Sequence, residues 1–266
     1  MTATDHSLHD KIAVITGSTS GIGLGIAQGL AALGAGIVLN GFGDATAIEV
    51  VCDEIRRAHG VAVRYDAADM SDPSAVTAMI TRTEQALGPV DILVNNAGIQ
   101  HVAPLEDFPI EKWDAILAIN LSAVFHASRV VVAGMKQRGW GRIINVASAH
   151  GLIGSAFKSA YVAAKHGVVG LTKVTALEAA EFGVTCNAVC PGYVWTPLVE
   201  RQVADQARVH GLSHEDVVRQ VFLAEQPTRR FATIAEIAGT VAFLCGPYAG
   251  SITGTTLAVD GGWTAH

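Results

Sequence analysis

The sequence predicts an α/β protein in which a doubly wound, Rossmann-type parallel sheet of seven strands carries helices on both faces. Short apolar runs alternate with helix-length segments rich in Ala, Leu and Val. Strand–helix–strand alternation implies right-handed crossovers and therefore a parallel sheet. A composition of 50% hydrophobic and 16% charged residues suits strands that are covered on both faces. A length of 266 residues fits a single unit of this kind.

The expected strands are short, apolar and evenly spread along the chain. They are Ile12–Thr16, Gly36–Asn40, Val61–Asp66, Asp91–Val94, Arg142–Ala147, Val184–Val189 and Thr255–Val259. The longest expected helix is Glu111–Arg138. Because no repeat, low-complexity tract or linker interrupts the chain, we expect residues 1–266 to form one dinucleotide-binding and catalytic domain.

One segment departs from the alternation. Residues 198–226 follow a strand but resemble two helical pieces separated by Gly211–Ser213. An insert at this place lies above the carboxyl ends of the strands, where ligands bind in doubly wound folds. We expect it to be a substrate lid. A packing appendage is the alternative.

Charge and hydropathy argue against two classes of binding protein. The formal net charge is −6, and the longest purely basic run is the pair Arg229–Arg230, so no patch suits nucleic acid. No uninterrupted apolar run approaches the roughly 18 residues of a membrane-spanning helix. Residues 1–11 are polar and contain no apolar core of a signal peptide, so we expect a cytoplasmic protein.

The cysteines carry no metal or disulfide pattern. Cys52, Cys186, Cys190 and Cys245 form no C-x-x-C pair, and no histidines stand at zinc spacing. We expect buried structural thiols and no metal site.

A glycine-rich turn follows the first strand and opens a helix. In residues 16–23, Gly17 allows a tight turn, while Gly21 and Gly23 allow the backbone to approach a pyrophosphate closely. The helix N-terminus then presents unpaired amides and its dipole to the phosphates. Strand–turn–helix context makes this signal stronger than a glycine triplet alone.

The spacing G-x-x-x-G-x-G resembles the turn of the short-chain dehydrogenase/reductase family. Three further motifs agree with that family: Asn95-Asn96-Ala97-Gly98, Tyr161-x-x-x-Lys165 and Pro191-Gly192. The resemblance runs from Lys11 to about Gly262. It implies a nicotinamide-dependent oxidoreductase that interconverts an alcohol and a ketone.

The Tyr161–Lys165 pair can provide the base of such a reaction. Free tyrosine has a pKa near 10 and needs help to ionise at neutral pH. Residues four apart in a helix share one face, so we expect the lysine cation to lower the pKa of the phenol. By resemblance, Lys165 also binds the nicotinamide ribose.

Two polar residues complete the expected catalytic group. Ser148 lies at the end of the fifth strand, where its hydroxyl can hold the substrate oxygen. In the family, the asparagine that corresponds to Asn120 holds a water of a proton relay. Singly, each residue could be an ordinary structural one, but the four occur together in family order.

The adenine-ribose end favours NAD over NADP. By spacing, Gly41 occupies the position at which an acidic residue usually accepts from the 2′-hydroxyl, and no Arg or Lys lies nearby to pair a 2′-phosphate. Phe42 can fill the space that a phosphate needs. We expect Gly41→Asp to sharpen the preference. Asp69 either contacts the adenine, as in the family, or is a turn or helix-cap residue.

The full set expected to contact the cofactor combines these motifs. It comprises Gly17, Thr19, Ser20, Gly21, Ile22, Gly23, Phe42, Asp69, Asn96, Ala97, Gly98, Tyr161, Lys165, Pro191, Gly192, Val194 and Thr196.

Polar residues gather where the substrate is expected. Lys158 is three residues before Tyr161, His150 is two after Ser148, and Gln100 follows the Asn-Asn-Ala-Gly motif. With Gln202 of the insert, they suggest a clamp for a small carboxylate, in which His150 is protonated or a neutral donor. Alternatively, Lys158 is merely solvated and His150 is an ordinary loop histidine.

Within the family, the local strings at residues 40–42, 98–102, 148–152, 158–161 and 196–199 resemble those of the (R)-3-hydroxybutyrate dehydrogenases, which implies interconversion of (R)-3-hydroxybutyrate and acetoacetate. That group often has tryptophan after Pro-Gly, and this chain has Tyr193, an aromatic wall with an added hydroxyl. The substrate-binding residues expected are Gln100, Ser148, His150, Lys158, Tyr161, Tyr193 and Gln202.

Two rival functions follow from the same sequence. One is the reduction of another β-keto compound such as a 3-oxoacyl thioester, which generally needs NADPH and a basic patch. The other is a non-catalytic NAD-binding protein, which we would expect to lack Tyr161 or Lys165. The apolar segments Ala115–Met135 and Tyr161–Ala180 further suggest a homotetramer.

Overall fold

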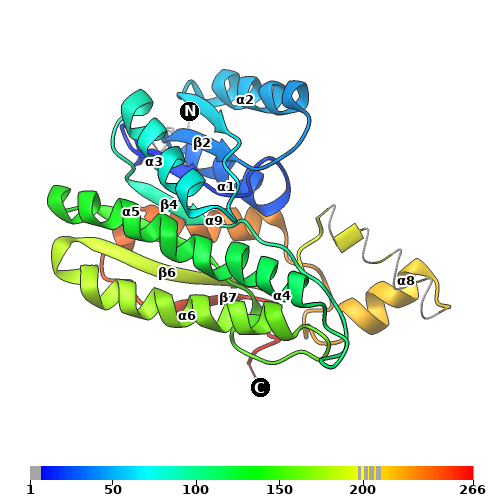
Figure 1. The fold of residues 1–266 in the computed structure, drawn as a ribbon. Helices are drawn as coiled ribbons and strands as arrows, with labels where there is room; N and C mark the ends of the chain where they lie inside the picture. Colours follow the sequence, from blue (N-terminus) through cyan, green and yellow to red (C-terminus); the bar gives the residue numbers. More distant parts are fainter. Residues whose placement is uncertain (1–6, 197–198, 201–202, 204–206, 208–210, 266) are drawn as a thin grey trace.

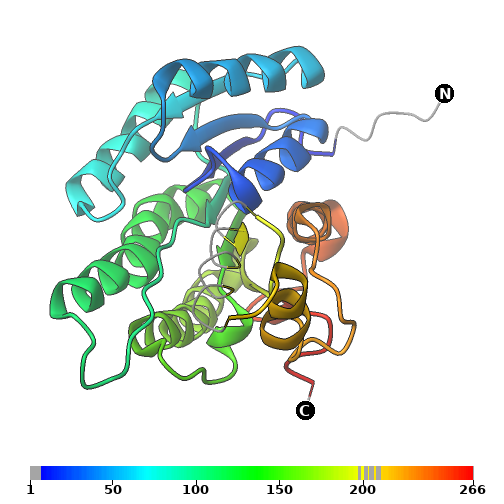
Figure 2. The ribbon, with the colours of Figure 1, turned by 90° about the vertical axis from the view of Figure 1, so that its right-hand side faces the viewer.

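The computed structural model describes residues 7–196, 199–200, 203, 207 and 211–265. They form a seven-stranded parallel sheet in the order β3-β2-β1-β4-β5-β6-β7. Figures 1 and 2 show this sheet with helices packed around it. The strands are β1 (Ile12–Ile15), β2 (Gly36–Asn40), β3 (Val63–Asp66), β4 (Ile92–Asn95), β5 (Gly141–Val146), β6 (Val184–Pro191) and β7 (Thr256–Val259). The predicted fold class is confirmed.

The sheet reverses its winding direction at β1. This strand pairs in parallel with β2 on one side, Ile15 opposite Leu39, and with β4 on the other, Ile15 opposite Val94. The chain therefore leaves β1 in one direction and returns to its other side. In open α/β sheets, ligands bind outside the carboxyl ends of the strands at such a switch point.

Three helices cover one face of the sheet. They are α1 (Gly21–Ala32), α2 (Ala45–His59) and α9 (Ile234–Cys245). Ile26, Cys52 and Val241 of these helices share one core cluster with Ile15 and Ile37 of the strands. Side chains on a strand point alternately to opposite faces, so Val14 belongs to the cluster on the other face.

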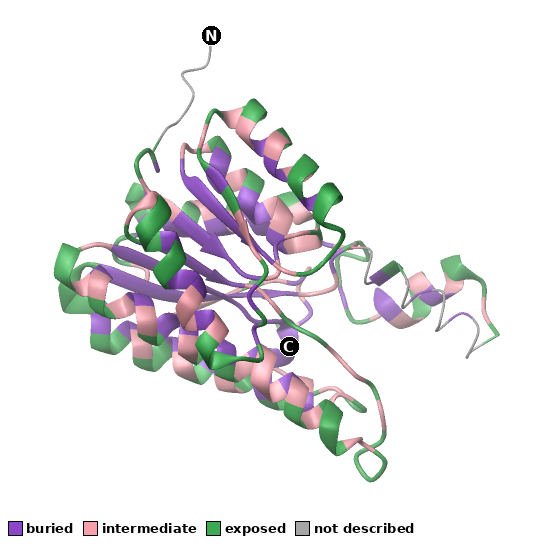
Figure 3. Cartoon of the chain, turned by 45° about the horizontal axis from the view of Figure 1, so that its top comes forward, coloured by how far each residue is buried: buried purple, intermediate pink, exposed green. Residues whose placement is uncertain are grey.

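The helices of the other face include the longest one of the fold. There α3 (Pro73–Leu87), α5 (Ala123–Arg138) and α6 (Ser159–Ala179) pack on the sheet. The helix α4 (Ile110–Leu117) continues through a π-helical turn, Ala118–Ser122, into α5. Figure 3 shows the buried sheet between helices whose outer faces are exposed.

This continuous helix, Ile110–Arg138, is long and apolar enough to cross a membrane by length and composition. An 18-residue stretch of this helix has a mean hydropathy of 1.7. The helix therefore has the length and composition of a membrane-spanning helix, although the sequence contains no long uninterrupted apolar run. Ala127, Val131 and Met135 recur at helical spacing and are buried against the sheet, as in a core helix.

The remaining elements are short. Three 3-10 turns are Ala149–Gly151, Ala180–Phe182 and Pro247–Ala249. In the predicted lid, α8 (His214–Val217) continues into a π-helical turn, Val218–Phe222, after Gly211 with its positive φ of 62°. Part of the first predicted helical piece lies outside the described residues. The described side chains of this insert form a small core of their own, to which Tyr193 adds its ring.

Candidate active site

A cleft of about 640 Å³ lies at the carboxyl ends of the strands. Every predicted cofactor-binding residue except Val194 lines it. The side chain of Val194 is instead 3% exposed and packs in the core, while its backbone bridges to Ala232. Ser148 and Gln100 line the same cleft. Motifs up to 179 residues apart in the sequence, from Gly17 to Thr196, thus meet at one place.

The phosphate-binding turn is shaped for close approach to a ligand. A Cβ on Gly17, whose φ is +61°, would stand 2.8 Å from the Cα of Ala97, and one on Gly23 would meet the Gly17 carbonyl. Ser20, the N-cap of α1, makes no side-chain hydrogen bond to the first turn. The amides of that turn are therefore left to a ligand in the cleft. These features fit a dinucleotide pyrophosphate.

Asn40 holds three segments around this turn and was missed by the sequence analysis. Its Oδ1 accepts from the amide of Gly17 at 3.2 Å, and its Nδ2 donates to the carbonyls of Asp66 and Ala68 at 3.1 and 2.9 Å. The side chain is fully buried. The sequence feature that could have identified Asn40 is its position as a polar residue at the end of an otherwise apolar strand.

At the adenine-ribose end, no acidic side chain of the described residues takes the place of the missing one beside Gly41. Gly41 and Phe42 line the cleft, and Phe42 is exposed. The carboxylate of Asp44 instead caps α2 by accepting from the amide of Ala47 at 2.9 Å. Oδ1 of Asp69 accepts from the amide and hydroxyl of Ser71, so Asp69 has the turn role while still lining the cleft.

The substitution Gly41→Asp, which the sequence suggested would sharpen the preference for NAD, does not test that preference alone. Gly41 has a φ of +146°, a conformation that residues with a side chain rarely adopt. A Cβ there would also lie 2.9 Å from Oγ1 of Thr19. An aspartate at this position would strain the turn as well as change its charge.

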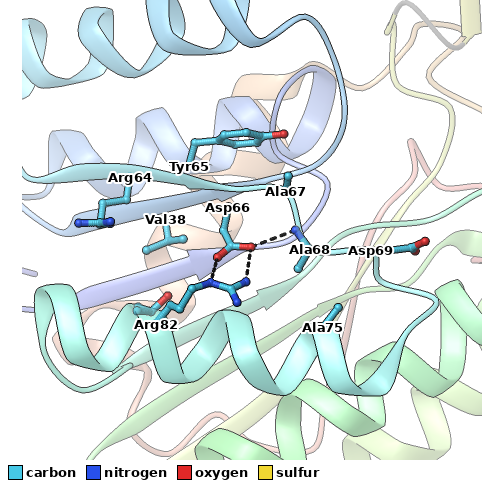
Figure 4. A pocket seen from close by; sticks show the side chains of 10 residues that line it. Val38, Arg64, Tyr65, Asp66, Ala67, Ala68, Asp69, Ala75 and Arg82 are labelled. Atoms are coloured by element: carbon cyan, nitrogen blue, oxygen red, sulfur yellow. Dashed lines mark hydrogen bonds and ion pairs between the residues drawn. The ribbon is translucent and has the colours of Figure 1, made fainter.

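A second hollow of about 600 Å³ lies beside the adenine end, between β3 and α3 (Figure 4). Asp66 and Arg82 point toward one another in it, with Nε and an Nη of the guanidinium donating to both carboxylate oxygens at 2.8 and 2.9 Å. The charge of Arg82 is therefore already paired with that of Asp66.

The catalytic candidates converge at the inner end of the cleft. Tyr161 and Lys165 stand on α6, and Ser148 follows β5. Nζ of Lys165 lies 5.6 Å from the centroid of the Tyr161 ring and donates to the carbonyl of Val146 at 2.8 Å. Burial lowers the pKa of Lys165 to about 8.

The expectation that Lys165 lowers the pKa of Tyr161 is wrong for the protein by itself. Burial raises the pKa of the phenol, and a hydrogen bond with Ser148 offsets this only partly. The physical reason is that desolvation disfavours the phenolate, while the ammonium of Lys165 is itself buried and bonded to a carbonyl.

Asn120 lies in the π-helical turn between α4 and α5. Its Oδ1 accepts from the amide of Ile99, and its Nδ2 donates to the carbonyl of the same residue, both at 2.9 Å. This pair of bonds fixes the segment after Asn95-Asn96-Ala97-Gly98 beside the helix. π-Helical turns often occur at functional sites.

The predicted carboxylate-binding side chains are buried or partly buried. Burial lowers the pKa of His150 to about 4, with smaller contributions from Lys158 and His166. Burial thus favours the neutral form of the ring at neutral pH. Its Nε2 is buried without a hydrogen-bond partner among the described residues.

Lys158 is not merely solvated. It is the N-cap residue of α6, and burial lowers the pKa of its ammonium to about 8. Its Nζ lies 3.5 Å from the hydroxyl of Tyr193. Gln202 lies outside the described residues.

Trp263 was not predicted and forms a wall of this region. Its ring stacks on Tyr193 at 5.2 Å between centroids and meets the edge of His150 at 5.1 Å. His150 in turn meets Tyr161 at 6.0 Å. A lone tryptophan after two glycines near the end of the sequence carries no signal that it reaches this site.

Comparisons with known proteins agree with this geometry. The family model described as short chain dehydrogenase matches residues 11–207. The chain is 56% identical to the D-beta-hydroxybutyrate dehydrogenase of Rhizobium meliloti, covering 96% of this chain and 99% of that one. It is 54% identical to the D-beta-hydroxybutyrate dehydrogenase of Cupriavidus necator, covering 97% and 100%.

A solved structure shows the same architecture. The crystal structure of an actinorhodin polyketide ketoreductase variant with NADPH superposes with a TM-score of 0.90 at 36% sequence identity. The match covers 96% of this chain and 98% of that one.

Proposed function

The chain belongs to the short-chain dehydrogenase family, and on that basis we propose that it interconverts (R)-3-hydroxybutyrate and acetoacetate with NAD. The substrate assignment rests on the set of polar side chains near Tyr161. Burial lowers the pKa of both Lys158 and His150, and no carboxylate contributes to the shift of Lys158. The two bacterial relatives carry the same activity in their names.

Tyr161 acts as the proton acceptor in the oxidation. Ser148 partly offsets the rise in the pKa of this phenol, so the substrate hydroxyl can lie near both oxygens, and Ser148 can stabilise the developing negative charge. Bound NAD would supply the hydride acceptor, and its positive charge would favour the phenolate of Tyr161 that burial alone disfavours. By resemblance to the family, Lys165 would hold the nicotinamide ribose, and Asn120 would hold a water that takes part in the proton relay.

Lys158 and His150 hold the carboxylate of the substrate. The ammonium supplies a charge-assisted hydrogen bond, and neutral His150 donates a second one from its orphaned ring nitrogen. Gln100, which lines the cleft, and Gln202 add neutral donors. The carboxylate and the hydroxyl are the two anchors of the substrate. Together with a pocket for the methyl group, they fix the handedness at C3.

NAD is preferred over NADP. No basic side chain lines the cleft at Gly41 and Phe42, and Arg82 is paired with Asp66. We also propose a homotetramer in the cytoplasm. The negative net charge argues against nucleic acid as a partner, and the exposed apolar side chains on α5 and α6 support an assembly of several copies.

The decisive experiment compares acids with neutral alcohols. We expect kcat/KM to be highest for (R)-3-hydroxybutyrate with NAD, and Lys158→Ala to lower it by about 10- to 150-fold, the loss of one charge-assisted hydrogen bond. Turnover of a neutral secondary alcohol of similar size should change little. Equal losses for both, or no preference for the acid in the wild type, would contradict the proposal. Faster reduction of a 3-oxoacyl thioester with NADPH would favour the rival reductase.

A further inference from the structure

The ammonium of Lys158 has an aromatic hydroxyl as its neighbour. Nζ stands 3.5 Å from the Tyr193 hydroxyl and 5.6 Å from the centroid of its ring. Burial is the cause of its lowered pKa, and no carboxylate contributes to that shift. A flexible, partly desolvated ammonium without an ion-pair partner among the described residues needs another group to fix its position.

Tyr193 is held firmly enough to serve as that group. Its amide donates to the side-chain carbonyl of Gln226 at 2.5 Å, and its own carbonyl accepts from the amide of Ala232 at 2.9 Å. Gln226 is fully buried and also donates to the carbonyl of Arg230. The backbone of Tyr193 is thus tied on both sides.

The ring of Tyr193 is fixed as well. Trp263 stacks on it with an interplanar angle of 20°, and Phe222 meets it at 5.0 Å between centroids. A stacked ring between two aromatic neighbours loses little freedom on binding. The hydroxyl therefore has a defined position at the end of a rigid side chain.

The protonation states suit a hydrogen bond from lysine to phenol. Burial raises the pKa of Tyr193 to about 12, so its hydroxyl stays protonated at neutral pH. A neutral phenol oxygen can accept from an ammonium, and an ammonium has three N–H donors. One donor directed at Tyr193 leaves two for a ligand carboxylate.

We propose that the Tyr193 hydroxyl is a positioning residue that fixes the Lys158 ammonium for the carboxylate of the substrate. The inference rests on the proposed function, because it presupposes the carboxylate clamp. It assigns to the hydroxyl a role in affinity for short acids and not in the chemical step. A tryptophan here, as in the resembling group, would supply the ring without a hydroxyl.

A double-mutant cycle tests this role without requiring turnover. Wild type, Tyr193→Phe, Lys158→Ala and the double variant are saturated with NADH and titrated with butyrate at constant ionic strength, with the fluorescence of bound NADH as the readout. Tyr193→Phe keeps the ring and its stacking. Tyr248→Phe is the matched control, because Tyr248 is 89% exposed on the surface. Melting temperatures report whether each variant is folded.

We expect Tyr193→Phe to weaken butyrate binding about 3- to 10-fold, as for one hydrogen bond to a charged group. In the Lys158→Ala background, the same change should have less than a twofold effect, since a residue that acts through another is not additive with it. With (R)-3-hydroxybutyrate, KM should rise by the same factor while kcat stays within about twofold.

An equal loss in both backgrounds would overturn the inference, because Tyr193 would then act by packing or direct contact. No loss in Tyr193→Phe, or no butyrate binding in the wild type, would overturn it as well. If butyrate binds and the cycle is non-additive but the wild type does not oxidise (R)-3-hydroxybutyrate, the proposed function fails and the positioning role stands.

Discussion

Burial moves the pKa values of Tyr161 and Lys165 apart. The pKa of the phenol is raised and that of the ammonium is lowered to about 8, so the protein alone keeps the phenol protonated at neutral pH. A protonated phenol is the acid needed for ketone reduction, and its ionised form is the base needed for alcohol oxidation. Cofactor charge and pH therefore decide which direction the pair serves.

Replacing Tyr161 by Phe removes this proton donor and acceptor while keeping the ring. We expect turnover to fall by at least about 100-fold, the lower range for loss of general acid–base catalysis. NADH binding should stay nearly intact, because Gly17, Gly21 and the other parts of the turn are unchanged. Steady-state kinetics in both directions and a fluorescence titration of NADH measure the two effects. Substantial residual activity at neutral pH would identify another group as the base.

The sequence could indicate His150 and Lys158 as candidates because each stands at a short spacing from a catalytic candidate. Lys158 precedes Tyr161 by three residues, and His150 follows Ser148 by two. Trp263 could not be found in this way, because its contacts with Tyr193 and His150 join segments 70 or more residues apart. The protonation state of His150 also depends on burial, which the spacing does not determine.

At the scale of elements, the turn between β2 and α2 determines what the adenine end can accept. Its glycines, Gly41 and Gly43, have φ values of +146° and +158°, and Asp44 is used as the helix cap. The sequence indicated the missing acidic residue but not the backbone conformation, which depends on Thr19 packed against Gly41. Strand boundaries were predicted within about two residues, since they follow apolar runs.

Phe42→Arg should weaken the preference for NAD. Phe42 is 68% exposed and lines the cleft, so an arginine there can reach a 2′-phosphate without disturbing the core. We expect kcat/KM with NADP to rise roughly tenfold, as for one charge-assisted hydrogen bond, and kcat/KM with NAD to change little. Initial rates with both cofactors measure this. Comparable kcat/KM values for NAD and NADP in the wild type would contradict the proposed specificity.

At the scale of the whole molecule, the two long helices α5 and α6 carry exposed apolar side chains on their outer faces. The alternation of strands and helices predicted the sheet, its parallel direction and the helices on both faces, because each follows from local periodicity and right-handed crossovers. The sequence did not show which apolar residues of α5 and α6 face outward. In the structure, Phe125, Val174 and Leu177 are exposed while their neighbours Ala127 and Ala176 are buried.

These outward apolar side chains predict the site of subunit contact. Leu177 is 82% exposed on α6, which lies beside α5 (Figure 1). Closed dihedral tetramers bury such faces against their symmetry mates, and a charge placed there would be desolvated on assembly. We expect light scattering at micromolar concentration to give four times the chain mass for the wild type and half that mass or less for Leu177→Glu. Val50→Glu, at an exposed apolar position on α2, should remain tetrameric. A monomeric wild type would contradict the tetramer, and a tetrameric Leu177→Glu protein would place the contact on another face.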